Sequence, residues 1–186
     1  SGHVGLFCEG IAKVARQVHP NFTITEEALM SVAKLYPDFI EKLMRAAEVH
    51  AGKKVTLTIR LLELGLPDVL PKELAKFAAS VVDKEIEKSR PKRLEAIEEP
   101  ARIKWDPAFD HKKILALLKE TCFLDRISLE CGVAMGAILE YLAAEIIELG
   151  GFRTREQNQT EITLSHLVEA VRADEELAEA FGKKLV

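Results

Sequence analysis

The sequence predicts an all-α protein. Apolar residues recur at steps of three and four through most of the 186-residue chain, and this spacing places them on one face of a helix. Strand signals are confined to two short segments with β-branched or alternating residues, at residues 55–58 and 161–164. With 48% hydrophobic residues, the chain has enough apolar material for a packed core.

Helices are expected in the first half at residues 6–19, 25–51, 58–66 and 71–88. The long helix begins at Thr25, whose hydroxyl can accept from backbone amides, and it carries Glu26 and Glu27 in its first turn, where the helix dipole favours negative charge. Pro37 interrupts this helix. Because an internal proline removes one backbone hydrogen bond and clashes with the preceding turn, we expect a kink near residues 33–37 rather than a break.

Helices are expected in the second half at residues 108–120, 128–151, 163–172 and 174–181. The long one shows a single apolar stripe and begins at Ser128, again a hydroxyl before an acidic first turn. The two long helices start 103 residues apart, and Thr58 and Thr163, which precede the next short helices, lie 105 residues apart. This recurrence of short, long and short helices indicates an internal duplication.

Residues 89–107 separate the two repeats. They contain three prolines and a dense run of both charges, which is typical of a linker between domains at residues 3–88 and 108–182. Trp105, close to the linker's end, is expected to pack onto the fold. A long helix flanked by two short ones encloses little volume, so the two repeats are expected to cross and bury each other's apolar faces.

The charge distribution limits the classes of function. Residues 1–90 carry a net charge of +1 and residues 91–186 carry −5, which together give −4. A negative total argues against coating nucleic acid by bulk charge alone, although local basic patches can still bind phosphate.

Neither enzyme chemistry nor a membrane span is indicated by the motifs. The three cysteines have no metal-like spacing, the histidines are scattered, and no nucleotide-binding glycine motif occurs, so we expect a non-enzyme without cofactors. The chain has no apolar run of about 20 residues and no signal-peptide pattern, which predicts an intracellular protein with no membrane partner. His19 and His166 are expected to be structural, and Cys122 and Cys131 are expected to be buried as small apolar residues.

Two stretches of the second half closely resemble histone 2A. Residues 137–149 (AILEYLAAEIIEL) are similar to its central helix and residues 173–177 (ADEEL) to its later acidic turn, within an ungapped similarity from about Phe109 to Leu177. The first half resembles histone 2B through residues 17–20 (QVHP) and 70–76 (LPKELAK). The order 2B then 2A on one chain resembles the histone doublets of giant DNA viruses such as the marseilleviruses.

The resemblance implies a fold and a function. Each half is then a histone fold, and the two form an intramolecular handshake pseudo-heterodimer. This unit is expected to join a histone 3/histone 4-like partner, itself expected to be a doublet, and to wrap double-stranded DNA in a nucleosome-like particle. The locations implied are the virion and the host nucleus or viral factory.

The resemblance also implies DNA-binding residues in the paired loops and on the first helix of the second half. Histone-type wrapping inserts arginines into the minor groove without reading the bases. Arg126 matches the family's groove-inserting arginine. The other residues expected to contact DNA are Lys53, Lys54, Thr56, Lys113, Lys119 and Thr160.

One loop departs from the family pattern. Glu161 stands where histone 2A has a DNA-facing arginine, and Asn158 and Gln159 replace a basic pair. Because Glu161 repels phosphate, we expect the DNA to unwrap more easily than it does from the cellular particle.

Six acidic residues of the second half coincide with the family's acidic patch, which receives arginine side chains from other proteins. Glu73 could contribute to it from the first half. The six residues are Glu140, Glu145, Glu148, Asp174, Glu175 and Glu176.

Two alternatives to DNA packaging stay open at this point. The first is a histone-fold regulatory subunit of a transcription or chromatin complex that binds mainly protein, and the second is a helical interaction module that binds no nucleic acid. Glu161 and the net charge of −4 favour these alternatives. Arg126 together with the acidic positions favours DNA packaging.

Overall fold

The computed structural model describes residues 3–90 and 105–185, which are mainly helical as predicted. The first half contains α1 (Val4–Val18), β1 (Thr23–Ile24), α2 (Glu26–Ala33), α3 (Tyr36–Ala51), β2 (Thr56–Leu57), α4 (Ile59–Val69) and α5 (Lys72–Ser89). The second half contains α6 (His111–Thr121), β3 (Arg126–Ile127), α7 (Glu130–Glu156), β4 (Glu161–Ile162), α8 (Leu164–Ala173) and α9 (Glu175–Phe181). The middle of the predicted linker, residues 91–104, lies outside the described residues.

The first long helix is divided in two near Pro37, so the predicted single helix over residues 25–51 is wrong. The Lys34 N–H still donates to the carbonyl of Met30, four residues back (3.0 Å), but the Leu35 N–H donates to the carbonyl of Val32, only three residues back (3.0 Å). Pro37 then falls in the first turn of α3, where a missing N–H costs no helical hydrogen bond. The proline therefore stands at the start of a second helix.

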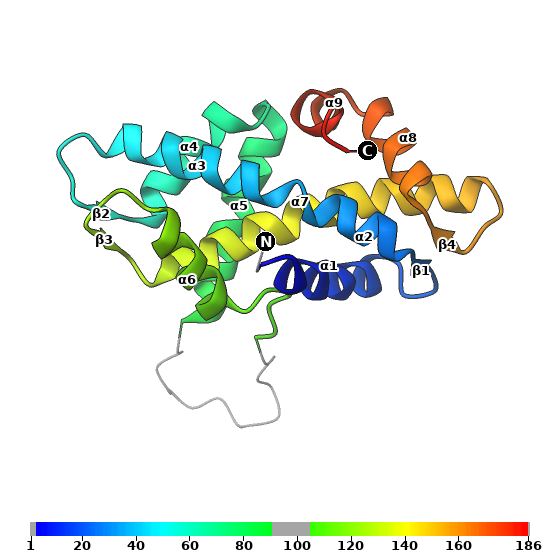
Figure 1. The fold of residues 1–186 in the computed structure, drawn as a ribbon, viewed down its shortest axis with the longest axis horizontal. Helices are drawn as coiled ribbons and strands as arrows, with labels where there is room; N and C mark the ends of the chain where they lie inside the picture. Colours follow the sequence, from blue (N-terminus) through cyan, green and yellow to red (C-terminus); the bar gives the residue numbers. More distant parts are fainter. Residues whose placement is uncertain (1–2, 91–104, 186) are drawn as a thin grey trace.

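The two halves are joined by two pairs of short parallel strands (Figure 1). β1 pairs with β4, with Thr23 opposite Glu161, and β2 pairs with β3, with Thr56 opposite Arg126. The signals at residues 55–58 and 161–164 correspond to β2 and β4, whereas β1 and β3, which are equally short, were not predicted. Each strand pairs with a strand of the other half, so both loop pairs are built jointly, and they lie at opposite ends of the molecule (Figure 1).

α7 is the central helix, against which α1, α5, α6 and α8 pack (Figure 1). The sequence predicts one apolar stripe here, but residues 131–139 are buried all round the helix. Small residues permit this close packing. A Cβ on Gly132 would lie 2.3 Å from the carbonyl oxygen of His111, at the start of α6. The resulting core is continuous and takes side chains from both halves.

Strand pairing determines where α7 begins. The predicted cap at Ser128 is wrong, because the helix starts at Glu130 and its N-cap residue, Leu129, makes no side-chain capping bond. Instead the Ser128 carbonyl accepts the Cys131 N–H (3.0 Å), while the Ser128 N–H donates to the carbonyl of Leu57 (2.8 Å). The three predicted threonine caps are confirmed, since side-chain oxygens accept backbone N–H bonds at Thr25, Thr58 and Thr163.

The structure also shows the surroundings of the tryptophan, histidines and cysteines for which the sequence predicted structural positions. Trp105 donates from Nε1 to Glu85 Oε1 (2.6 Å) and packs against the ring of His111. His19 and His166 are buried, which confirms their structural role. Cys131 is buried as well, whereas Cys122 is half-buried. In the described ranges, no helix is both long enough and apolar enough to span a membrane.

Candidate nucleic-acid interface

The loops at the β2–β3 end bring four of the predicted DNA-binding residues together. Gly52 ends α3 with a positive φ of 58°, and this lets the chain reverse and present Lys53 and Lys54 to solvent. Thr56 lies opposite Arg126 in the parallel pair. The Arg126 N–H donates to the carbonyl of residue 55 (3.0 Å), and its side chain is exposed.

Two helices also begin at the β2–β3 end. α4 starts after Thr58, whose side chain accepts the Leu61 N–H (3.4 Å), and α7 starts three residues after β3. Helix N-termini carry unpaired amides and the positive end of the helix dipole, both of which attract phosphate. The carboxylate of Glu130, in the first turn of α7, is paired with Arg90 (3.2 Å). This end of the molecule therefore combines basic side chains with two helix N-termini.

α6 carries the two predicted lysines at its opposite ends. Asp110 caps the helix by accepting the N–H groups of Lys112 (2.9 Å) and Lys113 (3.3 Å). Lys113 is exposed in the first turn, whereas Lys119 is exposed in the last turn. Lys119 therefore lies on the turn of α6 that leads into the β2–β3 end, and Lys113 lies further from it along the helix.

The β1–β4 end is less basic. The Thr160 carbonyl accepts the Thr23 N–H (3.0 Å), so Thr160 lies beside the first half as its loop position predicts. Glu161 is exposed in β4 and stands opposite Thr23. The preceding turn passes through Asn158, whose φ of 57° is a left-handed conformation that asparagine tolerates better than most residues. A carboxylate therefore occupies the position at which the family pattern predicts a DNA-facing arginine.

Sequence reasoning missed two arginines at the β1–β4 end. The helix was expected to end at Gly151, but α7 continues to Glu156 and carries Arg153 and Arg155 in its last turn. Arg155 lies over the rings of Phe22 and Phe152, with its guanidinium carbon 5.7 and 5.9 Å from their centroids. Arg153 pairs with Glu156 (3.5 Å). The signal in the sequence was the presence of Arg153 and Arg155 directly before the loop that leads to β4.

Acidic side chains from three parts of the chain surround Tyr141. Burial raises the pKa of the Tyr141 hydroxyl well above its ordinary value, and the nearby negative charges raise it further. The pKa of Glu145 is raised first by burial and then by Glu148 and Asp174. We define the acidic cluster as Glu73, Glu145, Glu148, Asp174 and Glu176.

Two members of the acidic cluster bind backbone amides. Asp174 caps α9 by accepting the Leu177 N–H (2.9 Å). The Glu176 carboxylate accepts the N–H groups of Glu73 (3.2 Å) and Leu74 (2.9 Å), in the first turn of α5. These bonds hold the cluster in place without neutralising its charge.

The remaining two predicted acidic residues have other surroundings. Glu140 accepts the Ala108 N–H (3.4 Å), and its charged neighbours are Glu85, Lys13 and Lys88. Its side chain is thus directed toward a different set of elements from those that form the acidic cluster. Glu175 is exposed in the first turn of α9, next to the cluster in sequence.

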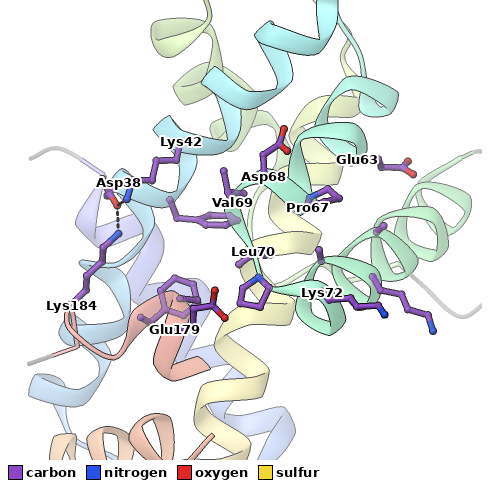
Figure 2. Close-up of a pocket in the computed structure, with 17 residues that line it drawn as sticks. Asp38, Lys42, Glu63, Pro67, Asp68, Val69, Leu70, Lys72, Glu179 and Lys184 are labelled. Carbon is purple, nitrogen blue, oxygen red and sulfur yellow. Dashed lines mark hydrogen bonds and ion pairs between the residues drawn. The ribbon is translucent and has the colours of Figure 1, made fainter. Parts of the chain in front are cut away.

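A recess of about 790 Å³ opens where α3, α9 and the turn between α4 and α5 meet (Figure 2). Lys184 and Lys42 both bind the Asp38 carboxylate at its edge, and charges of both signs surround it. None of the predicted DNA-binding residues lines this recess. Among the residues that the structure describes, no group of three or more His, Cys, Asp or Glu side chains is arranged to hold a metal ion.

Comparison with known proteins identifies histone relatives. The chain is 43% identical over 74 residues to a macro-type histone 2A of Capsaspora owczarzaki. The matched segment covers 40% of this chain and 20% of that protein. The chain is also 40% identical over 70 residues to a probable histone 2A of Arabidopsis thaliana, and this segment covers 38% of this chain and 53% of that protein. The chain therefore spans at most about half the length of these relatives. No protein-family model matches it.

A solved structure shows the same fold. The crystal structure of the histone from Methanopyrus kandleri superposes with a TM-score of 0.56 at 14% sequence identity, over 89% of this chain and 93% of that one. At this sequence identity the likeness concerns the fold alone. Because the superposed region covers 89% of this chain, it includes both halves of the chain. The chain is a histone-fold protein.

Proposed function

We propose that this chain is a structural chromatin protein that packages DNA as the histone 2B–2A part of a nucleosome-like particle. It contacts the DNA backbone and minor groove without sequence specificity, performs no catalysis and joins a histone 3/histone 4-like partner. The observation that carries this proposal is the pairing of β2 with β3. Within a histone fold, that pairing places Arg126 opposite Thr56, on a loop pair that also carries Lys53 and Lys54.

We further propose that the two halves are two histone folds in a handshake. Each half repeats a short helix, a long helical segment and a short helix, and each loop strand pairs with one from the other half. The viral doublet origin, with the virion and the host nucleus or viral factory as locations, stays a prediction based on the order of the halves. The similarity to histone 2A supports a chromatin setting.

Nuclease protection tests the packaging proposal. DNA is reconstituted with a histone 3/histone 4-like partner, with or without this chain, and the protected fragments are compared. We expect a longer discrete fragment when the chain is present, and a shorter one with Arg126→Glu. Lys76→Glu, an exposed reversal of the same charge on α5, is the matched control and should leave the length unchanged. If the chain adds no protection and elutes apart from the complex, the proposal is wrong.

The β1–β4 end should hold DNA more weakly than the β2–β3 end. Glu161 is exposed there and repels phosphate, although Arg155 lies nearby on α7. We expect Glu161→Arg to shift DNA release to higher salt. Glu179→Arg, an exposed change of the same charge on α9, is the control. Unchanged salt-dependent release with Glu161→Arg would contradict the expected role of this residue.

The acidic cluster is proposed to bind arginine-bearing segments of other proteins. Close carboxylates on rigid helices suit bidentate recognition of a guanidinium group. A fluorescent arginine-containing peptide should bind the chain, and Glu145→Ala with Glu148→Ala should weaken that binding. Glu26→Ala with Glu27→Ala removes the same charge from the start of α2 and is the control. Equal losses in the two pairs would indicate an effect of net charge only.

A regulatory histone-fold subunit that binds mainly protein is the second candidate. The exposed Glu161 at a predicted DNA position, together with the net charge of −4, favours it. In that case the peptide binds but the nuclease pattern does not change.

A further inference from the structure

Two charged side chains of the first half hold the loop that leads to Arg126 in the second half. Arg45 and Glu48 lie one turn apart on α3 and pair with each other, with 3.0 Å between Nη1 and Oε2. Arg45 Nη2 donates to the carbonyl of Thr121, and Glu48 Oε1 accepts the Phe123 N–H (2.8 Å). The pair therefore binds the carbonyl of the last residue of α6 and an N–H of the loop that follows it.

The ring of Phe123 adds a third attachment. It lies under the Arg45 guanidinium, whose central carbon is 3.6 Å from the ring centroid, a cation–π arrangement. Phe123 is 79% exposed, whereas the Glu48 side chain is only 12% exposed. The ring does not enter the core, whereas its neighbours Cys122 and Leu124 pack against the core. The contacts with α3 therefore add to the burial of these neighbours and fix the backbone at Phe123.

Arg126 depends on this attachment through the shortness of its own strand. β3 has two residues, and its attachment to the first half includes the N–H bonds of Arg126 and Ser128 to the carbonyls of residues 55 and 57. Phe123 lies three residues before Arg126, so the chain between them spans at most about 10 Å. The position of residues 121–123 therefore limits where Arg126 can lie, because so short a segment has little slack.

We propose that Arg45 and Glu48 are positioning residues for DNA binding. They hold residues 121–123 so that Arg126 projects beside Lys53 and Lys54, although neither residue itself contacts DNA. This inference rests on the proposed function. It assigns to the middle of α3 a role that neither the repeat pattern nor the loop basicity indicates.

Two substitutions of Glu48 isolate the bond to the loop. Glu48→Ala removes both the charge and the acceptor for the Phe123 N–H, whereas Glu48→Gln removes the same charge but keeps one acceptor oxygen. Each is made in the full chain, with Arg126 intact and with Arg126→Ala. Affinity for a short random-sequence DNA duplex and its dependence on salt are then measured for every variant.

We expect Arg126→Ala to weaken binding and to reduce the slope of log affinity against log salt by about 1. Glu48→Ala should weaken binding by about threefold to tenfold and Glu48→Gln by less, because only the alanine variant releases the loop. In the Arg126→Ala background, Glu48→Ala should have no further effect. The Phe123 amide should lose its hydrogen-exchange protection in Glu48→Ala and keep it in Glu48→Gln.

The outcomes separate the inference from the function beneath it. Suppose that Arg126→Ala weakens binding. The positioning role is then wrong, while DNA binding stands, if Glu48→Ala and Glu48→Gln lose the same affinity. The same conclusion follows if Glu48→Ala loses as much affinity in the Arg126→Ala background as it does with Arg126 intact. If Arg126→Ala leaves affinity unchanged, the proposed interface itself is wrong. Should Glu48→Ala fail to fold by circular dichroism, Phe123→Ala removes the exposed ring under Arg45 and is subjected to the same comparison.

Discussion

A single glycine of α7 accommodates a buried histidine from the first half. A Cβ on Gly151 would lie 2.1 Å from Nε2 of His19. The His19 ring donates to the carbonyl of Glu148 (3.0 Å) and stacks on Phe22, with 5.3 Å between ring centroids. Because these contacts hold the ring, it cannot move aside for a larger side chain. The histidine is structural for this reason, as its helix-end position predicts.

Gly151→Ala should lower the free energy of unfolding by about 1–3 kcal/mol, because the new methyl group overpacks the His19 ring. Urea denaturation measures the change. Gly5→Ala is the control: it lies in the first turn of α1, its Cβ meets nothing within 4 Å, and it should not lower stability. Equal effects of the two substitutions would contradict the packing argument.

Glu140 is a second residue whose surroundings matter, because they change the ionisation of its carboxyl group. Burial raises its pKa in the folded chain, so ionisation opposes folding, and stability is lost as pH rises through the folded-state pKa. Glu140→Gln keeps an acceptor for the Ala108 N–H and should raise the unfolding free energy at pH 7. The gain should disappear below about pH 4.5, the ordinary pKa, where both states are protonated. Denaturation across pH tests this, and a gain independent of pH would contradict it.

At the scale of elements, contacts from distant parts of the chain set several helix ends. α7 passes through Gly150 and Gly151 because those positions receive Leu167 and His19, whereas glycines near a helix end usually predict termination. α5 follows Pro71, whose ring has no acceptor atom to cap the helix, and Glu176 supplies the acceptors from the other half. Local sequence cannot indicate either arrangement.

Glu176→Ala should destabilise the chain by about 1–2 kcal/mol, because two amides at the start of α5 lose their acceptor and the helix dipole loses a favourable charge. The Leu74 amide should exchange faster with solvent. Glu175→Ala, one residue earlier and exposed, should change stability by no more than about 0.5 kcal/mol. A similar effect of both variants on the Leu74 amide would show that this cap is not used.

At the scale of the whole molecule, the two halves complete each other. Both strand pairs cross between the halves, and α1 and α5 of the first half pack on α7 of the second. A Cβ on Gly10 of α1 would lie 2.2 Å from the ring of Phe109, which shows how closely the halves approach. Neither half can bury its long helix alone.

Residues 1–90 and 105–186 produced as separate chains should each have little stable helix, because their apolar faces lack a cover. Mixing them in equal amounts should restore the helical circular dichroism of the intact chain. The intact chain should unfold in one cooperative transition, as a shared core predicts. A cooperative unfolding transition in either isolated half would contradict this account.

The sequence alone predicted most of the helices, their repeated order and the cluster at the β2–β3 end. Helical periodicity and threonine caps are local properties, and the resemblance to histones supplied Lys53, Lys54, Thr56 and Arg126. Only the tertiary structure decided that Pro37 starts a new helix and that α3 holds the loop before Arg126. It also decided which carboxylates gather around Tyr141. These features depend on side chains far apart in the sequence, whose positions are determined by packing between the halves and leave no period or motif in either one.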